Sequence, residues 1–378
     1  MTDQSFRARF PVTERWAFLD HAAVAPLSLP AVTALREYAD SLAGNGIAAV
    51  KQWLDRIAAV RMLAARLINS PDVNDLYFIP NTTHGIGIVA EGFPWRPGEN
   101  VVLASEEYPS NQYPWMNLAA RGVEVRCVTS RGNRIAIDDI RAAMDHRTRV
   151  LTVSSVEFAS GYRNDLNAFG ALCRERDVFF FVDAIQSLGV FPLDVQCTPI
   201  DALAADGHKW LLGPEGAGIG YIRREWVERL HPIGVGANSV VHPYAFTTID
   251  FTLKPHAGRW EGGAYNLPGI TALGASLKLL MDEGIGQIEE RITTLTDYLC
   301  EQAASRGWSV FSSRTPGEKS GIVSLVHPSL PASEVQRRCR AGGVIVNNRA
   351  DRVRVSPHAY NTRAEIDRVI EVVKAELR

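Results

Sequence analysis

The chain of 378 residues has an ordinary globular composition, with 46% hydrophobic and 22% charged residues, and this length predicts two or three folding units. Its formal net charge of -2 argues against general nucleic-acid binding, which needs a clear basic excess. No signal-like apolar segment, membrane-length apolar run or metal-binding spacing of Cys and His is present, and the five cysteines are scattered. We therefore expect a reduced, soluble, cytoplasmic protein without a disulfide framework, metal site or membrane partner.

Short apolar runs alternate with helical patterns from about residue 75 onward. The runs lack the period-two alternation of half-exposed strands, so we interpret them as strands buried on both faces. They are 76–80, 101–104, 123–128, 150–153, 178–182 and 218–222. Strands that alternate with amphipathic segments such as 138–144 and 168–174 predict an α/β fold with a mainly parallel sheet. Sheets of this kind bind ligands at the carboxyl ends of their strands.

A second, smaller α+β unit is predicted from about Lys254 onward. Its expected elements are two long helices, two strands and a final helix, at 272–281, 288–305, 322–326, 353–355 and 363–378. The first 19 residues are too few to fold alone, and we expect them to pack against this unit. The prediction is therefore a large domain of residues 20–253 and a small domain of residues 1–19 and 254–378. The Pro- and Gly-rich stretch 233–246 is a candidate for a mobile or subunit-bridging loop.

Among six lysines, only Lys209 stands in an apolar frame that is followed by a glycine-rich turn. Partial desolvation of this lysine would lower its pKa and favour the neutral amine. A neutral amine can form a Schiff base with an aldehyde cofactor. The alternative is a buried lysine stem with its charged end in water, and the segment alone leaves both possibilities open.

Two further signals precede Lys209. Asp183 directly follows the very apolar run 178–182, about one strand–helix–strand unit upstream, where a carboxylate can pair with a protonated pyridine nitrogen. The turn 81–84 follows a strand and starts a helix, which places backbone N–H groups and hydroxyls where they can bind phosphate. Each signal also has an alternative explanation without a ligand: Asp183 could be a helix N-cap, and the turn 81–84 could be an ordinary capped helix start. In this order on one parallel sheet, they offer a phosphate site, a partner for a ring nitrogen and an aldehyde acceptor.

With these residues, the chain resembles the fold-type I pyridoxal-phosphate (PLP) enzymes, and among them the class V aminotransferases. That group includes cysteine desulfurases, selenocysteine lyases, cystine C–S lyases and isopenicillin N epimerase-like proteins. The resemblance runs from Phe18-Leu-Asp-His-Ala-Ala23 to the segment 354–362, and its most specific parts are Asp183-x-x-Gln186 and Gly207-His-Lys-Trp210. It implies the fold of that group, with a large PLP-binding domain and a smaller α+β domain.

The resemblance also implies roles for single residues around the cofactor ring. Lys209 would form the Schiff base, and Asp183 would pair with the pyridine nitrogen; these two are the expected catalytic residues. Gln186 would hydrogen-bond the phenolic oxygen of the cofactor. Tyr108 would stack on the ring, at a position where desulfurases usually carry His, and tyrosine is a poorer proton shuttle near neutral pH.

The phosphate and the substrate would be held by other segments. His208, Thr82 and Thr83 are expected at the phosphate. Arg354 is expected to bind the α-carboxylate of an amino-acid substrate, because its planar fork suits bidentate recognition. His21 is the second expected substrate-binding residue. The segment 260–266 resembles the stretch that reaches the phosphate from the partner subunit, which implies a homodimer with its active site near the subunit interface.

Three further positions depart from the family pattern. Phe158 stands at a position that is usually Asn. Asp206 stands where a phosphate-contacting Ser is common, and a carboxylate beside phosphate is unfavourable unless it turns away. Ala264 replaces the Thr that the partner subunit usually contributes. These changes predict a phosphate site with fewer side-chain donors.

The loop before Arg354 contains no cysteine, whereas desulfurases place a nucleophilic cysteine there. Cys339 is the nearest one, and we interpret it as a structural residue in a helix. The resemblance therefore favours a C–S (Cβ) lyase or an epimerase-like enzyme over a persulfide-forming desulfurase. A transaminase is the main alternative. For an epimerase, the extra acid would come from His21, His358 or Tyr360, which the family places near the substrate.

Two other classes are less consistent with the sequence. The glycine run 216–220 precedes a strand, whereas a dinucleotide fingerprint follows a strand and opens a helix, which argues against a nucleotide-dependent oxidoreductase. A non-catalytic binding protein that keeps this fold would have little need of Lys209, Asp183, Gln186 and Arg354 together.

Overall fold

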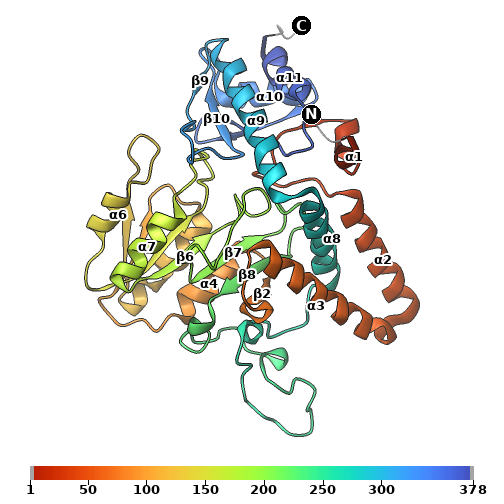
Figure 1. Ribbon diagram of the computed structural model, residues 1–378, viewed down its shortest axis with the longest axis vertical. Helices are drawn as coiled ribbons and strands as arrows, with labels where there is room; N and C mark the ends of the chain where they lie inside the picture. Colours follow the sequence, from red (N-terminus) through yellow and green to blue (C-terminus); the bar gives the residue numbers. More distant parts are fainter. Residues whose placement is uncertain (1–3, 375–378) are drawn as a thin grey trace.

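The computed structural model describes residues 4–374 and is built around a seven-stranded sheet (Figure 1). The strand order is β2-β8-β7-β6-β5-β3-β4. In that order the strands span Leu76–Ile79, Gly218–Ile222, Ala202–Asp206, Phe179–Asp183, Thr148–Ser154, Asn100–Ala104 and Glu124–Val128. Only β8 runs antiparallel to its neighbours, and the run from β7 to β4 is parallel. The prediction of a mainly parallel sheet is confirmed.

Both faces of this sheet are buried, which explains why its strands are continuously apolar. In β6, Phe179 and Phe181 join one hydrophobic cluster with helix α4 (Thr82–Gly92), while Phe180 and Val182 join another cluster on the opposite face. The second cluster also contains residues of α3 (Val50–Leu67), α7 (Leu166–Arg176) and α8 (Leu267–Glu283). Burial on both faces leaves no position for a regular polar alternation.

The sequence analysis did not identify strand β7, which leads directly to Lys209. Its sequence Ala202-Leu-Ala-Ala-Asp206 contains no β-branched or aromatic residue, so that propensity gives no strand signal. The segment 184–201 between β6 and β7 contains turns and no helix, whereas we expected a strand–helix–strand unit. Pro192 and Pro199 lie in this segment and do not favour a helix.

The second unit holds a four-stranded antiparallel sheet with the order β12-β13-β10-β9. These strands span Asn347–Arg349, Arg352–Val355, Val323–Val326 and Ser309–Val310. Helices α9 (Ile285–Ala304), α10 (Ala332–Ala341) and α11 (Arg363–Lys374) pack with it. Figure 1 shows this unit above the large sheet, with the N-terminal segment beside it.

The N-terminal segment joins this second unit through a short parallel pairing. Strand β1 (Ala17–Phe18) pairs with β11 (Val344–Ile345), and α1 (Gln4–Arg7) carries the buried Phe6. In contrast, α8 packs along α3 and α2 (Leu29–Asn45), beside the large sheet. We therefore propose that the boundary between the two units lies after α8, later in the chain than the position near 254 that the sequence suggested.

Three features complete the fold. Two short helices, α5 (Tyr113–Met116) and α6 (Ile137–Ala143), lie in the connections around β4. The stretch from 233 to 256 has little regular structure, and Figure 1 shows it extending from the bottom of the molecule. Within residues 4–374, no helix is long and apolar enough to cross a bilayer.

Candidate active site

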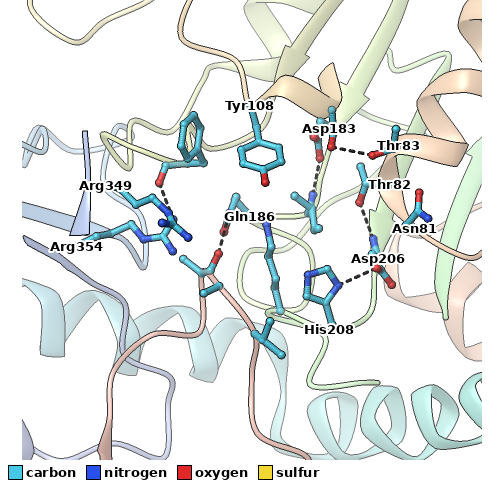
Figure 2. Close-up of a pocket in the computed structure, with 17 residues that line it drawn as sticks. Asn81, Thr82, Thr83, Tyr108, Asp183, Gln186, Asp206, His208, Arg349 and Arg354 are labelled. Carbon is cyan, nitrogen blue, oxygen red and sulfur yellow. Dashed lines mark hydrogen bonds and ion pairs between the residues drawn. The ribbon is translucent and has the colours of Figure 1, made fainter. Parts of the chain in front are cut away.

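A cavity of about 350 Å³ opens at the carboxyl ends of the parallel strands (Figure 2). Its walls come from distant parts of the chain, and the two arginines in Figure 2 lie at the opposite end from the start of α4. The lining residues are Ala22, Ala23, Val24, Asn81, Thr82, Thr83, Tyr108, Ser110, Phe158, Asp183, Ile185, Gln186, Asp206, His208, Lys209, Arg349 and Arg354. Apart from His21, every residue that the sequence assigned to the site lines this cavity.

Lys209 follows β7 in a tight turn and points into the cavity. Desolvation lowers its pKa to about 8, although the charge of Asp183 acts in the opposite direction. Its Nζ lies 5.6 Å from the centroid of the Tyr108 ring. At pH 7 about a tenth of the amine is therefore in its neutral, nucleophilic form, a much larger fraction than for an ordinary lysine.

Asp183 is the last residue of β6 and is almost fully buried. Burial raises its pKa to about 6, while the backbone N–H of Ile185 and the charge of Lys209 favour the carboxylate. No arginine or lysine forms a salt bridge with it among the described residues. A buried carboxylate at a cavity wall is well placed to receive a cationic N–H from a ligand.

The N-terminus of α4 forms the opposite end of the cavity. Asn81 caps the helix by accepting the N–H of His84, and Asn81, Thr82 and Thr83 line the cavity at this end of the helix. The hydroxyl of Thr83 donates to Ser110, at 2.8 Å. The hydroxyl of Thr82 accepts the N–H of Asp206 at 3.0 Å. Helix α4 is eleven residues long, and the hydroxyls of Thr82 and Thr83 lie at its N-terminus. This arrangement suits an anion such as phosphate.

Asp206 is held away from direct competition with such an anion. Its Oδ1 accepts the N–H of Gly207, and its Oδ2 lies 2.7 Å from Nδ1 of His208. This pairing leaves Nε2 of His208 for a ligand. The departure at Asp206 therefore orients the imidazole that the sequence placed at the phosphate.

The amide of Gln186 is fixed between two neighbours. Its Oε1 accepts the indole N–H of Trp210 at 2.9 Å, and its Nε2 donates to the carbonyl of Ala22 at 3.2 Å. One amide hydrogen is left for an acceptor in the cavity. This agrees with a hydrogen bond to an oxygen on a bound ring.

Tyr108 and Phe158 form an aromatic wall, with ring centroids 5.1 Å apart in an edge-to-face arrangement. The backbone before Tyr108 is anchored by Glu107, a buried residue that the sequence analysis missed. Its carboxylate accepts hydrogen bonds from Ser154 and from the side chain of Asn111. Burial raises the pKa of Glu107 to about 7. Phe158 offers only its ring to the cavity, because its carbonyl is bonded to Arg354.

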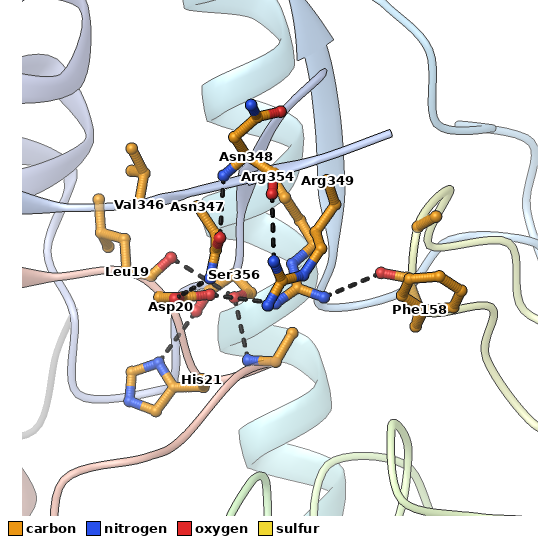
Figure 3. A network of polar contacts seen from close by, with 12 residues as sticks. Leu19, Asp20, His21, Phe158, Val346, Asn347, Asn348, Arg349, Arg354 and Ser356 are labelled. Atoms are coloured by element: carbon orange, nitrogen blue, oxygen red, sulfur yellow. Dashed lines mark hydrogen bonds and ion pairs between the residues drawn. The ribbon is translucent and has the colours of Figure 1, made fainter. Parts of the chain in front are cut away.

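Arg354 is almost fully buried and is bound to the protein itself (Figure 3). Its NH2 lies 3.2 Å from Oδ1 of Asp20, and its NH1 donates to the carbonyl of Phe158 at 3.0 Å. Asn347 also donates to Asp20, at 2.6 Å. Arg354, the residue predicted to bind the substrate carboxylate, thus reaches the cavity with its positive charge already offset by Asp20.

The expectation that His21 binds substrate needs correction. His21 is fully buried, and its ring lies 2.9 Å from the carbonyl of Ser356 and 2.6 Å from the hydroxyl of Tyr360. Burial lowers its pKa to about 4. The neighbouring residues Ala22 and Ala23 line the cavity in its place. His21 thus connects the N-terminal segment to the C-terminal region.

Further lining residues carry no assignment from the sequence. Ser110 lies two residues after Tyr108, and Arg349 lies in the cysteine-free stretch before Arg354. A spacing of five residues between Arg349 and Arg354 could have raised the question of a second arginine. The segment with Ala264 lines a separate cavity of about 310 Å³, next to His84.

The cavity contains no cysteine. Cys339 lies buried in α10, and burial raises its pKa to about 12, so the thiol is poorly reactive. The two exposed cysteines, Cys127 and Cys197, also lie outside the lining. The expectation that Cys339 is structural agrees with this position.

Comparison with known proteins gives a family match over most of the chain. Residues 17–369 match the model described as aminotransferase class-V. A probable cysteine desulfurase of Methanothermobacter thermautotrophicus is 28% identical, over 99% of this chain and 98% of its own. The apo structure of a cysteine desulfurase from Thermococcus onnurineus superposes with a TM-score of 0.91 at 22% identity, covering 99% of this chain and 98% of the other.

The cystine C–S lyase C-DES has a similar structure. A mutant of C-DES, solved with glycine covalently linked to the PLP cofactor, has a TM-score of 0.92 at 24% identity. The complex of C-DES with its reaction product cysteine persulfide has a TM-score of 0.90, and both alignments cover 97% of this chain and 99% of the other. The likeness to these structures confirms the predicted fold.

Replacing Asp20 with Ala tests the buried pair. We expect Asp20→Ala to lower the free energy of unfolding by about 3–5 kcal/mol, because Arg354 would stay buried without its counter-charge. Urea unfolding at pH 7 measures this. As a control, Asp55→Ala breaks an exposed pair with Lys51 and should cost at most about 1 kcal/mol. Equal costs for both variants would show that the buried Asp20–Arg354 pair adds no more stability than an exposed pair.

Proposed function

Because the chain belongs to the aminotransferase class-V family, we propose that it is a PLP-dependent enzyme that acts on an amino-acid substrate, most simply as a C–S (Cβ) lyase. The observation that carries the proposal is one cavity that combines a desolvated lysine, a buried carboxylate and a helix N-terminus. These groups match the aldehyde, the ring nitrogen and the phosphate of this cofactor. The cavity and its donors therefore fit the cofactor.

Each part of the cofactor would have its own residues. Lys209 would hold the aldehyde carbon covalently, and Asp183 would accept a hydrogen bond from the protonated ring nitrogen. Thr82, Thr83 and His208 would hold the phosphate. Gln186 and Tyr108 would fix the ring from its edge and its face. When bound, the cofactor withdraws electrons from the substrate and so acidifies the Cα–H bond.

The residues of the chain direct the reaction of the bound substrate. Arg354 would orient the substrate carboxylate from the end of the cavity opposite α4. The amine of Lys209, once displaced by the substrate's own amino group, would accept the proton from Cα. The carboxylate of Asp183 would keep the ring nitrogen protonated. In a lyase, the electron pair left by the Cα proton would form a Cα–Cβ double bond while the Cβ–S bond breaks and the leaving sulfur takes the bonding pair. Water would then convert the released enamine to pyruvate and ammonia.

Two observations support a lyase over the other reactions of this family. A persulfide-forming desulfurase needs a cysteine nucleophile, and neither the cavity lining nor the β12–β13 hairpin contains one. An epimerase needs a second acid, but His21, His358 and Tyr360 are buried outside the lining. The named relative C-DES is a cystine C–S lyase, and transamination remains the second candidate because of the family itself.

We also propose a homodimer with the active site near the subunit interface. The segment 260–266 does not line the cavity of its own chain, which agrees with a contribution to a second copy. The adjacent loop exposes apolar side chains, such as Phe246 at 78% and Ile249 at 89%. Such exposure is typical of a surface that another chain covers.

The first experiment concerns Lys209. Borohydride reduction of the protein with bound PLP should fix the cofactor on Lys209, because this is the desolvated amine in the cavity. Peptide mapping by mass spectrometry reads the position. Lys209→Ala should lose the label and the yellow absorbance, while Lys278→Ala, which removes an exposed lysine of α8, should keep both. A label on another lysine would contradict the assignment.

The pH dependence of cofactor uptake is a second test. With a pKa of about 8, the neutral fraction of Lys209 rises about tenfold between pH 6 and 7 and levels off above about pH 9. The rate of PLP uptake by cofactor-free protein should follow this curve in stopped-flow absorbance. An ordinary lysine would instead give a rate that keeps rising to about pH 10.

The products decide the reaction type. With L-cystine, we expect pyruvate, ammonia and cysteine persulfide in equal amounts, and Cys339→Ser should change the rate less than twofold because this thiol is buried outside the cavity. Alanine together with a protein persulfide that is lost in Cys339→Ser would indicate a desulfurase. Amino transfer to an added keto acid would indicate a transaminase. A protein that stays colourless with PLP would indicate a binding function.

A further inference from the structure

The charged groups around the cavity can be matched one by one. Asp183 interacts with the charge of Lys209 and could instead pair with a ring nitrogen, and Asp206 is paired with His208. Asp20 is paired with Arg354. Each of these carboxylates therefore has a cationic or N–H partner in or beside the cavity.

Arg349 has no carboxylate of its own. No acidic side chain forms an ion pair with it among the described residues, and its guanidinium donates only to the neighbouring carbonyl of Asn348, at 3.3 Å. Its charge also acts on Asp20, but that carboxylate is already paired with Arg354. The side chain of Arg349 is exposed and lines the cavity, so its guanidinium is available to an anionic group of a ligand.

The backbone fixes Arg349 at this place. Arg349 pairs with Arg352 across a two-residue turn, whose central residues Ala350 and Asp351 both lie in the left-handed region, with φ of 48° and 57°. This is the geometry of a tight hairpin turn whose twist matches that of the strands. It places Arg349 beside Arg354 (Figure 3), and both arginines line the cavity (Figure 2).

The charge of Arg349 lowers the pKa of two other groups that line the cavity, Lys209 and Arg354. Desolvation lowers the pKa of Lys209, and the nearby charges of Arg354 and Arg349 lower it further. Burial likewise lowers the pKa of Arg354, with Arg349 as an additional cause. A ligand with a single carboxylate, bound at Arg354, would leave the guanidinium of Arg349 without an anionic contact of its own.

We propose that Arg349 is a specificity-determining residue that binds a second anionic group, so that the preferred substrate is an amino acid with an acidic or otherwise anionic group beyond Cβ. The proposal rests on the proposed function, because it takes Arg354 as the site of the α-carboxylate. It names the substrate class by charge: carboxylate, sulfinate or a distal amino-acid carboxylate would all meet a guanidinium fork.

Two probes without an amino group test Arg349 without the reaction. Succinate carries two carboxylates and propionate carries one, and calorimetry with the holoprotein measures the Kd of each. Wild type should bind succinate at least tenfold more tightly than propionate, about the size expected for one charge-assisted contact. Arg349→Gln should remove most of this difference, and Arg349→Lys should keep part of it. The control Arg340→Gln removes an exposed charge on α10 and should keep all of it.

The same comparison with amino acids uses the absorbance change of the holoprotein on adding L-aspartate or L-alanine. A preference for aspartate that is lost in Arg349→Gln supports the proposal. Equal affinities for both in wild type, or an equal loss of both in Arg349→Gln, would overturn it, and the latter would assign the α-carboxylate to Arg349. Failure of the proposed function would instead appear as a protein without an absorbance response to any amino acid, while the calorimetric comparison of succinate with propionate still decides the role of Arg349.

Discussion

The constraint on which the candidate site depends is the removal of charged groups from water at the carboxyl ends of parallel strands. The register of β5, β6 and β7 brings Ser154, Asp183 and Ala204 side by side, so that the turns after these strands open on one edge. The apolar layers on both faces then bury the ionisable groups at that edge. Burial makes Lys209 a better nucleophile and Asp183 a stronger acceptor than either would be in water. The polar residues of the site are thus activated by the core that carries them.

How much of this could be predicted from the sequence depends on how local the signal is. The strands with Val and Phe were recognisable from their composition, and Lys209 and Asp183 were found because each follows or precedes a distinctive run. Strand β7 was missed, because an Ala-rich strand owes its conformation to its two neighbours in the sheet. His21 and Ala22 are adjacent in the chain, and only the packing decides that the alanine faces the cavity while the imidazole faces Tyr360.

Arg349 shows the limit of a motif. The family pattern assigns a role to one arginine near the end of this sequence, Arg354, and gives no role to Arg349 five residues before it. Its meaning depends on charges from three other segments, at Asp20, Asp183 and Asp206, whose partners become known only in three dimensions. Specificity of this kind depends on which charged groups from distant segments lie together in a cavity. The order of residues along the chain does not give this information.

The pair of Asp20 and Arg354 joins residues 334 positions apart, and this has a consequence for synthesis on the ribosome. The proposed cofactor side of the cavity is encoded before residue 210, so the sheet that carries it can form while the chain is still growing. The proposed substrate side needs Arg354, which is synthesised long after Lys209. Asp20 therefore stays without its partner until 334 further residues have been added, and a chain that stops before residue 354 would have the groups proposed for the cofactor but not the arginine proposed for the substrate carboxylate.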